Sequence, residues 1–445
     1  RSARFAAPFA ISGALVTAPV SGQERKPAAA NAGTTAALER SLVDETTLDA
    51  VLRVALANNP DLTEARERAR ADRESAPAAA RLPDPEFEYQ LWAQPLARPL
   101  ALDEAQMHMF GLRQSIPAPG SLGARADAAS EQAKVTGETR RAREQDLVLR
   151  VRRAYAQYYR ADREFRVHLD HMRLMEQVLD VARAGYQGGR GSQQDVLRAA
   201  VSISRLHNDV AVVDGERRTA RGLLNTLMAR PVEAPLGPPA ALQPAEVELR
   251  AAELERSLAD RPELVAAESA ARAREHELDA ARSIQRWPSF MVGVQYMFMP
   301  TMMEDKHNYG VMLSMSLPWL NPRYGEEVRA AEARVSAERS ALSSSRAAAR
   351  YELFEAFERL KAARESLAII DRDVLPQAAQ SVEIAQAAYR GGQGDSLALL
   401  DSLKSLLDVR IERERALTRV DGALADVERA AGRPLRSGAT GGAPR

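Results

Sequence analysis

The sequence predicts a mainly α-helical chain with a small β part, built as two tandem repeats, each with a β-hairpin and long antiparallel coiled-coil helices. Three observations lead to this prediction. Motifs in the first half recur about 202 residues later, long proline-free stretches keep a heptad pattern, and four short apolar runs alternate as strands do. Such a chain is expected to be elongated, because no compact domain accommodates helices of this length.

The composition excludes several classes of function. The 445 residues are 45% hydrophobic and 27% charged, which allows a large core but is too polar for a bundle of membrane helices. Lysine plus arginine equals aspartate plus glutamate at 61 each, and no basic arm interleaved with aromatics is present, so we expect no nucleic-acid partner. The chain has no cysteine, which excludes disulfides, thiol catalysis and thiolate metal sites.

The first 35 residues are expected to be a signal-peptide remnant and a linker. Arg1 and Arg4 precede an apolar stretch from Phe5 to Val20, and small residues follow. The alternative is a disordered tail, because Pro8 and Pro19 interrupt any helix. No later run reaches the roughly 18 apolar residues of a spanning helix, so entry into a membrane would require strands.

A duplication sets the domain plan. Asn59 to Leu62 recurs as Arg261 to Leu264 with an offset of 202, and Tyr186 to Gly191 recurs as Tyr389 to Gly394 with an offset of 203. We therefore expect a first repeat over 36–230, a proline-rich linker over 231–245, a second repeat over 246–435 and a disordered tail over 436–445.

Each repeat is expected to contain one very long helix, a glycine turn and a return helix. From Leu147 to Tyr186, apolar and alanine positions recur at steps of four and three, which is a heptad pattern. We expect helices at about 121–187 and 192–229 in the first repeat, and at about 325–390 and 395–431 in the second.

Four apolar runs between the short and long helices are expected to be strands, at about 86–92, 106–116, 289–299 and 308–317. From Phe290 to Phe298, large apolar residues alternate with small, polar or methionine residues, which fits a strand in a barrel with one apolar face. Alternation alone also fits a half-buried sheet in water. Four strands cannot close a barrel without exposed edges, so several copies would have to contribute, and three copies of four strands give twelve.

This order of elements, doubled from Leu48 to Leu435, resembles the TolC family of outer-membrane efflux proteins. The most specific feature is a tyrosine-x-x-glycine turn followed by an acidic, leucine-containing helix start, at Tyr186 to Leu197 and at Tyr389 to Asp401. The resemblance implies a homotrimer with a 12-stranded barrel in outer-membrane lipid of a Gram-negative bacterium and a helical tunnel in the periplasm. It also implies a passive exit duct of a tripartite efflux or secretion system, with a periplasmic adaptor and an inner-membrane pump as partners.

The resemblance further implies that the glycine turns form gated tunnel tips. The turn residues are Tyr186, Gly188, Gly189, Gly191, Gly391, Gly392 and Gly394. Asp195 and Tyr389 match two of three residues that close the tip in the founding member, whereas the third, an arginine, falls on Gly394. Arg190 or Arg390 lies close enough in sequence to replace it.

Two further acidic residues belong to the tips. The resemblance places Asp401 in a ring of three acids that would attract cations. The alternative for Asp195 and Asp395 is that they cap the helices that follow them.

Methionine is concentrated in the second hairpin. Seven of the twelve methionines lie between Met291 and Met315, and Met302, Met303 and His307 are low-ranking candidates for a soft metal such as copper or silver. Such a site would fit the heavy-metal branch of the family. The alternative, that methionine fills the wall, is preferred, and no metal or other cofactor is expected.

The main rival function is a soluble periplasmic coiled-coil adaptor or scaffold. An adaptor of this kind should carry a glycine- and lysine-containing hairpin within one helical hairpin, and the sequence shows none. No grouping of serine, histidine and aspartate and no isolated acid pair is present, so we expect no enzyme.

Overall fold

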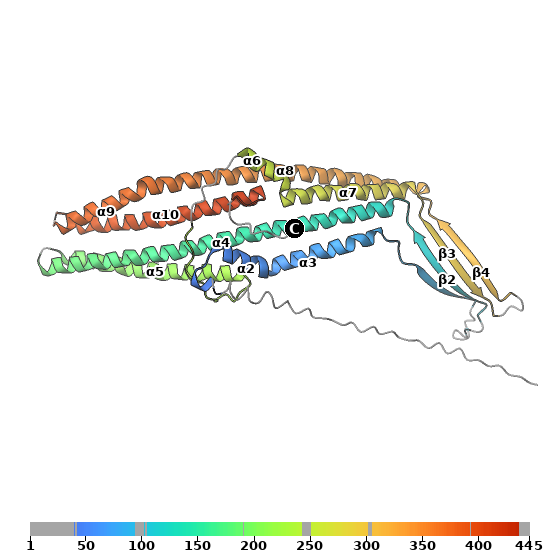
Figure 1. The fold of residues 1–445 in the computed structure, drawn as a ribbon, viewed down its shortest axis with the longest axis horizontal. Helices are drawn as coiled ribbons and strands as arrows, with labels where there is room; N and C mark the ends of the chain where they lie inside the picture. The colour runs from blue at the N-terminus through green and yellow to red at the C-terminus, as the bar shows by residue number, and fades with distance from the viewer. Residues whose placement is uncertain are drawn as a thin grey trace, which may run out of the picture.

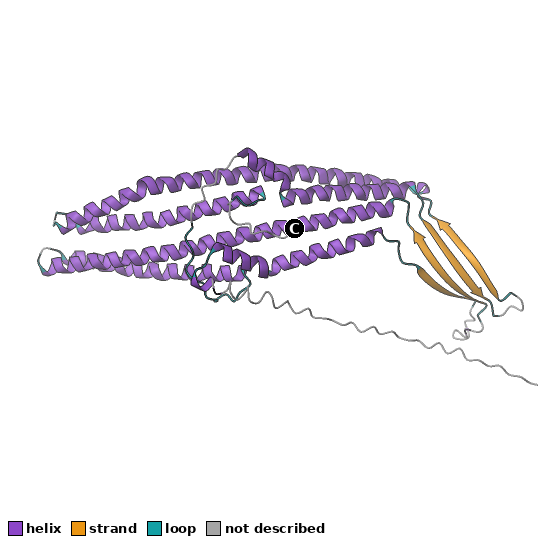
Figure 2. Cartoon of the chain, viewed as in Figure 1, coloured by secondary structure: helices purple, strands orange, loops and turns teal. Residues whose placement is uncertain are grey.

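The computed structural model describes residues 40, 42–93, 102, 105–189, 191–242, 251–300, 305–391 and 393–435. The first repeat contains α2 (Leu48–Asn58), α3 (Pro60–Ser75), β1 (Glu86–Trp92), β2 (Met107–Ile116), α4 (Ser121–Gln187) and α5 (Gln193–Leu227). The second contains α6 (Ala251–Ser257), α7 (Pro262–Arg286), β3 (Phe290–Phe298), β4 (His307–Met315), α8 (Arg323–Ile369), α9 (Leu375–Arg390) and α10 (Ser396–Ala431). The predicted fold class is confirmed: two repeats of long antiparallel helices carry a small sheet at one end (Figure 1, Figure 2).

The longest element is α4, with 67 residues and a length of about 100 Å. It begins after Gly120, whose φ of +82° suits glycine, and it ends at Gly188. Heptad positions such as Leu147, Val151 and Ala154 are buried. From Val151 to Glu164 the buried residues surround most of the helix, because α4 packs against helices on both sides there.

The helices lie side by side in a single layer rather than in a compact bundle (Figure 1). In the half nearest the sheet, neighbouring helices follow the order α3, α4, α7, α8. In the half nearest the glycine turns, the order is α5, α4, α10, and then α8 with α9. The layer therefore has two free edges, one along α3 and α5 and the other along α8 and α9. No helix in the described part of the chain has an apolar stretch of the length that a bilayer requires.

Within the span where a long helix is expected, about 325–390, the helical type changes at one place. The chain forms a π-helical segment, Ile370–Val374, between α8 and α9. Pro376 lies at the start of α9 and has no backbone N–H, and its ring would collide with the carbonyl group four residues earlier in a regular helix. The wider π-turn before it removes this clash, and the sequence pattern did not reveal it because the apolar spacing continues across the segment.

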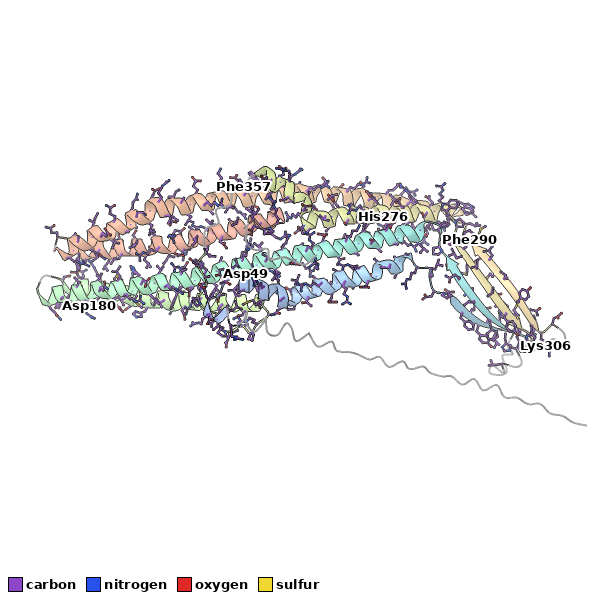
Figure 3. All side chains as sticks on the ribbon, viewed as in Figure 1. Asp49, Asp180, His276, Phe290, Lys306 and Phe357 are labelled. Carbon is purple, nitrogen blue, oxygen red and sulfur yellow. The ribbon has the colours of Figure 1, made fainter. Side chains whose placement is uncertain are left out.

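The two expected hairpins merge into one antiparallel sheet with the order β1, β2, β3, β4. Strand β2 pairs with β3 from His108 opposite Phe298 to Ile116 opposite Phe290, so the sheet joins the two repeats. In Figure 3, Phe290 marks the helix end of the β3–β4 hairpin and Lys306 marks its far end. Strands β1 and β4 each have a single neighbour in the described chain.

Midway along the helices, residues 231–242 form a segment that we call the strap. Its carbonyl groups at Gly237 and Ala240 accept hydrogen bonds from the hydroxyls of Tyr158 (2.8 Å) and Tyr155 (3.1 Å) on α4. The backbone of Thr46 is hydrogen-bonded to the strap on both sides. The part of the expected linker that the structure describes is therefore a packed element, and the largest apolar core, which includes Tyr155 and Leu224, lies beside it.

Candidate functional site

The glycine turns at the two tips are built alike. The N–H of Gly191 donates to the carbonyl of Gly185 (3.0 Å), and the N–H of Gly394 donates to the carbonyl of Ala388 (3.0 Å). A Cβ at Gly191 would lie 3.2 Å from the carbonyl carbon of Gly185, and one at Gly394 would lie 3.0 Å from the Cβ of Ala388. The tight bond across six residues therefore favours glycine at both positions, which is consistent with the repeated motif.

Each turn is followed by a capped helix. The hydroxyl of Ser192 accepts from the backbone N–H of Asp195 (3.2 Å), and the Asp195 carboxylate accepts from the N–H of Ser192 (3.1 Å), which makes a reciprocal capping box at the start of α5. Asp395 caps α10 by accepting from the N–H of Leu397 (3.2 Å).

Asp195 also connects the two tips. Its second carboxylate oxygen accepts a hydrogen bond from the hydroxyl of Ser396, the first residue of α10; we call this contact the tip bridge. The tip bridge is the largest cause that holds the pKa of Asp195 below its ordinary value, so the carboxylate is charged at neutral pH. Burial and the nearby charge of Asp195 raise the pKa of Tyr389, so this half-buried phenol stays neutral.

The remaining candidates at the tips are more loosely placed. Arg390 is exposed and has no hydrogen bond or ion pair among the described residues. Arg190 and Gly392 lie outside the described residues. Asp401 is exposed in a shallow groove along α10, beside Lys404 and Asp408. Tyr186, Gly188, Gly189 and Gly191 of the first turn are all exposed to solvent. Gly191 also approaches the backbone of Gly185 closely.

Below the tips, one apolar cluster holds both hairpins together. Met175 and Val178 of α4 and Leu206 of α5 pack in the same cluster as Val382 of α9 and Leu403 of α10. Leu403 and Met175 are at most 2% exposed. The two hairpins are therefore joined by the tip bridge at their tips and by apolar packing nearer the middle of the helices.

The sheet presents two unlike faces. One face is apolar and uncovered: Tyr309, Val311 and Leu313 of β4 are more than 70% exposed. Across the four strands this face includes an aromatic row of Tyr89, Phe110, Tyr296 and Tyr309, each opposite the next. Such a row at the end of an apolar band is typical of strands that meet a lipid interface.

The opposite face is small and polar, with ion pairs from Arg113 to Glu86 (3.4 Å) and Glu88 (3.1 Å). Five methionines of the strands lie on this same face by alternation, namely Met107, Met109, Met291, Met297 and Met312. Met109 and Met297 are directly opposite each other.

The soft-metal candidates are only partly described. Met302 and Met303 lie outside the described residues. His307 begins β4 on the apolar face, where its ring is hydrogen-bonded to the hydroxyl of Tyr296. No cluster of three or more histidine and acidic residues suited to a metal exists among the described residues.

Comparison with known families identifies the fold. The model of the family described as outer membrane efflux protein matches the chain twice, at residues 51–230 and 254–433. The chain belongs to this outer membrane efflux protein family. The two matches are displaced by 203 residues (254 minus 51), which equals the offset between the two glycine turns. As a member of this family, the chain is an outer-membrane efflux channel component.

Solved structures share the fold of this outer membrane efflux protein over most of their length. The outer-membrane channel OprN is 19% identical with a TM-score of 0.74, and the match covers 89% of this chain and 92% of OprN. CusC is 18% identical with a TM-score of 0.75, covering 89% and 94% of the two chains. The outer membrane protein VceC of Vibrio cholerae is 16% identical with a TM-score of 0.73, covering 87% and 97%. No curated protein matches the chain.

Sequence reasoning missed the serine of the tip bridge in this efflux protein. With an offset of 203, Asp195 corresponds to Ala398 and Ser396 corresponds to Gln193, so neither residue of the bridge is repeated. The bridge depends on how the two hairpins lie side by side, which no local pattern encodes. The gating role of the tip residues stays a prediction.

Proposed function

We propose that three copies of this chain close into one duct through the outer membrane. The observation that supports this proposal is that each chain is an open strip of wall. Its helical layer ends at α5 on one side and at α8 and α9 on the other, and its sheet ends at β1 and β4 on the same two sides. An open sheet edge is unstable in lipid because its backbone N–H and C=O groups have no partners, and closure by identical copies removes both edges.

Exposed apolar stripes on the free helices fit this closure. On α5, Val201, Val212 and Leu223 are 44–55% exposed and lie within about 40° of one another at 100° per residue. On α8, Tyr351, Phe354 and Ile369 are likewise exposed and share one face. We infer that the α5 stripe of one copy packs against the α8 stripe of the next.

The levels of the two stripes agree. Val212 lies 20 residues from the start of its hairpin arm at Ser192, and Ile369 lies 21 residues from Arg390 at the end of the other arm. Because both arms are helical, these positions lie at similar heights above the tips, and they are the pair expected to meet.

In the assembled duct, the apolar face of the sheet would contact lipid and the face with Arg113 would line the channel. The helices would extend this channel into the periplasm of a Gram-negative cell, with the glycine tips farthest from the membrane. We infer that a periplasmic adaptor coupled to an inner-membrane pump separates the hairpins at the tips, and that the duct itself is passive. The adaptor would shift the tips from a closed to an open packing of the helices if it binds the open packing more tightly than the closed one.

The absence of cysteine permits a clean test of the assembly. Val212→Cys combined with Ile369→Cys should give disulfide-linked dimers and trimers in membranes treated with a mild oxidant, because no other thiol exists in the chain. Each single variant is the control and should stay unlinked. A protein extracted in detergent that runs as a monomer without heating, with no cross-link in the double variant, would overturn the proposal.

For the cargo, we propose a soft metal ion, as in a heavy-metal efflux branch. The support is that the strand methionines share the face that would line the channel, where thioether sulfur would be accessible to copper or silver. Deletion of the gene should then lower tolerance to silver salts, and a plasmid copy should restore it. Unchanged silver tolerance would remove this cargo without affecting the duct.

A further inference from the structure

A hollow lined by arginines lies at the waist, between α4, α5 and the strap. Its volume is about 360 Å³, and four arginines line it, with Asp162 as the single acidic lining residue. The arginines are Arg166, Arg217, Arg218 and Arg221. We call this hollow the waist pocket.

The neighbouring carboxylates neutralise the four arginines only in part. Asp162 is 4% exposed and is shared by Arg166 (2.9 Å) and Arg217 (3.6 Å). Asp214, just behind the pocket, is shared by Arg217 (2.7 Å) and Arg218 (2.5 Å). Two carboxylates therefore serve three guanidinium groups.

The fourth arginine has the weakest set of partners. Arg221 makes no ion pair among the described residues, and its Nε atom is inaccessible to solvent without a hydrogen-bond partner there. Counting four arginines against Asp162 and Asp214 leaves an excess of two positive charges around the pocket. Among the arginines of the pocket, only the Nε–H of Arg221 is a buried donor without an acceptor in the described chain, whereas Arg166 and Arg218 are 50% and 62% exposed. This one unsatisfied donor, together with the excess of positive charge, favours an added anion.

Two of the lining side chains, Arg217 and Tyr158, are held in place by neighbouring groups. The guanidinium carbon of Arg217 lies 4.3 Å from the ring centre of Phe165, which fixes the guanidinium plane. The hydroxyl of Tyr158 is fixed by its hydrogen bond to Gly237 in the strap. Preorganised guanidinium groups bind planar or tetrahedral oxyanions through paired N–H donors with little loss of side-chain freedom.

The pocket does not coincide with the surface expected between copies. On α5, Arg217 and Arg221 are turned by about 140–180° from Val212 at 100° per residue. The apolar stripe and the pocket therefore lie on different sides of the helix, and closure of the duct leaves the pocket open.

We propose that the waist pocket binds a small dianion with oxyanion chemistry, either a phosphate group or a dicarboxylate. The charge excess of two matches such a ligand, and the volume accommodates a group of monosaccharide or amino-acid size. The bound anion would connect α4, α5 and the strap at the level where the two repeats meet. This inference does not depend on the cargo or on the gating of the duct.

The test uses the full-length protein in detergent, titrated by calorimetry with inorganic phosphate and, separately, with glutarate in a low-salt chloride buffer. We expect saturable binding of one anion per chain, weakened at higher ionic strength. Arg221→Gln should reduce affinity by about tenfold or more, because a charge-assisted contact is lost. Arg173→Gln is the matched control, since Arg173 is on α4 but pairs with Asp170 at an exposed site.

The outcomes separate the sources of the anion. Binding of phosphate alone identifies a phosphate ligand, binding of glutarate alone identifies a carboxylate ligand, and mutual competition identifies a general oxyanion site. If Arg221→Gln does not fold, Arg166→Gln, at a half-exposed side chain, replaces it. Absence of saturable binding to both anions, or equal affinities for the pocket variant and Arg173→Gln, would overturn the proposal.

Discussion

The carboxylate of Asp195 in the first tip accepts a hydrogen bond from the hydroxyl of Ser396 in the second, although 201 residues separate them. The same carboxylate caps α5 through Ser192. One side chain therefore fixes the start of one return helix and ties it to the start of the other. Any movement that separates the hairpins must break this contact.

Ser396→Ala should loosen the closed tip. Loss of a hydrogen bond to a charged group at this partly buried site costs at least about 1 kcal/mol, which would raise the ratio of open to closed channels about fivefold or more. Single-channel recording in planar bilayers would measure this ratio. Ser402→Ala is the control, because Ser402 only bonds within α10 to Ala398 (2.7 Å). Equal opening of both variants would mean that the tip bridge does not restrain the tips.

The stability of the protein should depend on pH through His171. Burial, followed by the charge of His168 and of Arg410, lowers the pKa of His171 to about 4, whereas Asp408 raises it. The unfolded chain binds a proton below the ordinary value of 6.5, but the folded chain does not until about 4. The contribution of His171 to the free energy of unfolding is therefore fully present above pH 6.5, and it is lost as the pH decreases from 6.5 towards 4.

His171→Gln should remove part of this pH dependence. The melting temperature of the wild type should fall more steeply between pH 6.5 and 4 than that of the variant, as measured by circular dichroism. His207→Gln is the control, because His207 is exposed on α5. A wild-type slope that the His171 substitution leaves unchanged would assign the acid sensitivity to other groups.

Glu428→Ala should be strongly destabilising. Arg152 of α4 and Glu428 of α10 form an ion pair whose side chains are 5% and 8% exposed. Removal of the acid leaves a buried guanidinium, with an expected cost of about 3–5 kcal/mol. The double variant Arg152→Met with Glu428→Leu should recover most of the loss. Urea unfolding at fixed protein concentration would measure both.

An exposed pair on the same two helices gives the comparison. Arg153 pairs with Asp426 at 2.6 Å, and the arginine is 59% exposed. Arg153→Ala should therefore cost at most about 1 kcal/mol. A similar loss for Arg153→Ala and Glu428→Ala would contradict the importance of burial.

Gly237→Ala should disturb the strap. A Cβ at Gly237 would lie 2.4 Å from the carbonyl oxygen of Val43, so the backbone of the strap would have to move. We expect a loss of about 1–3 kcal/mol and faster proteolysis near the waist. Gly422→Ala in α10, where no atom lies within 4 Å of the new Cβ, should instead be neutral or stabilising. A Gly237→Ala protein as resistant as Gly422→Ala would show that the strap tolerates the shift.

Local patterns in the sequence predicted most of the fold. Heptad spacing predicted α4, because helical periodicity depends only on neighbours three and four residues away. The repeated Tyr-x-x-Gly motif indicated both tips, since a glycine turn is also a local requirement. The pattern did not indicate the π-helical segment before Pro376, because the apolar spacing continues across that segment.

The sequence by itself determined the two repeats, their long helices and the alternating strands, since each depends on short-range periodicity. Only the tertiary structure decided that β2 pairs with β3, that Ser396 rather than an arginine meets Asp195, and that four arginines converge at the waist. These contacts join residues that are distant along the chain. They depend on the register in which the two repeats pack, and that register is set by the summed packing of whole helices, not by any one motif.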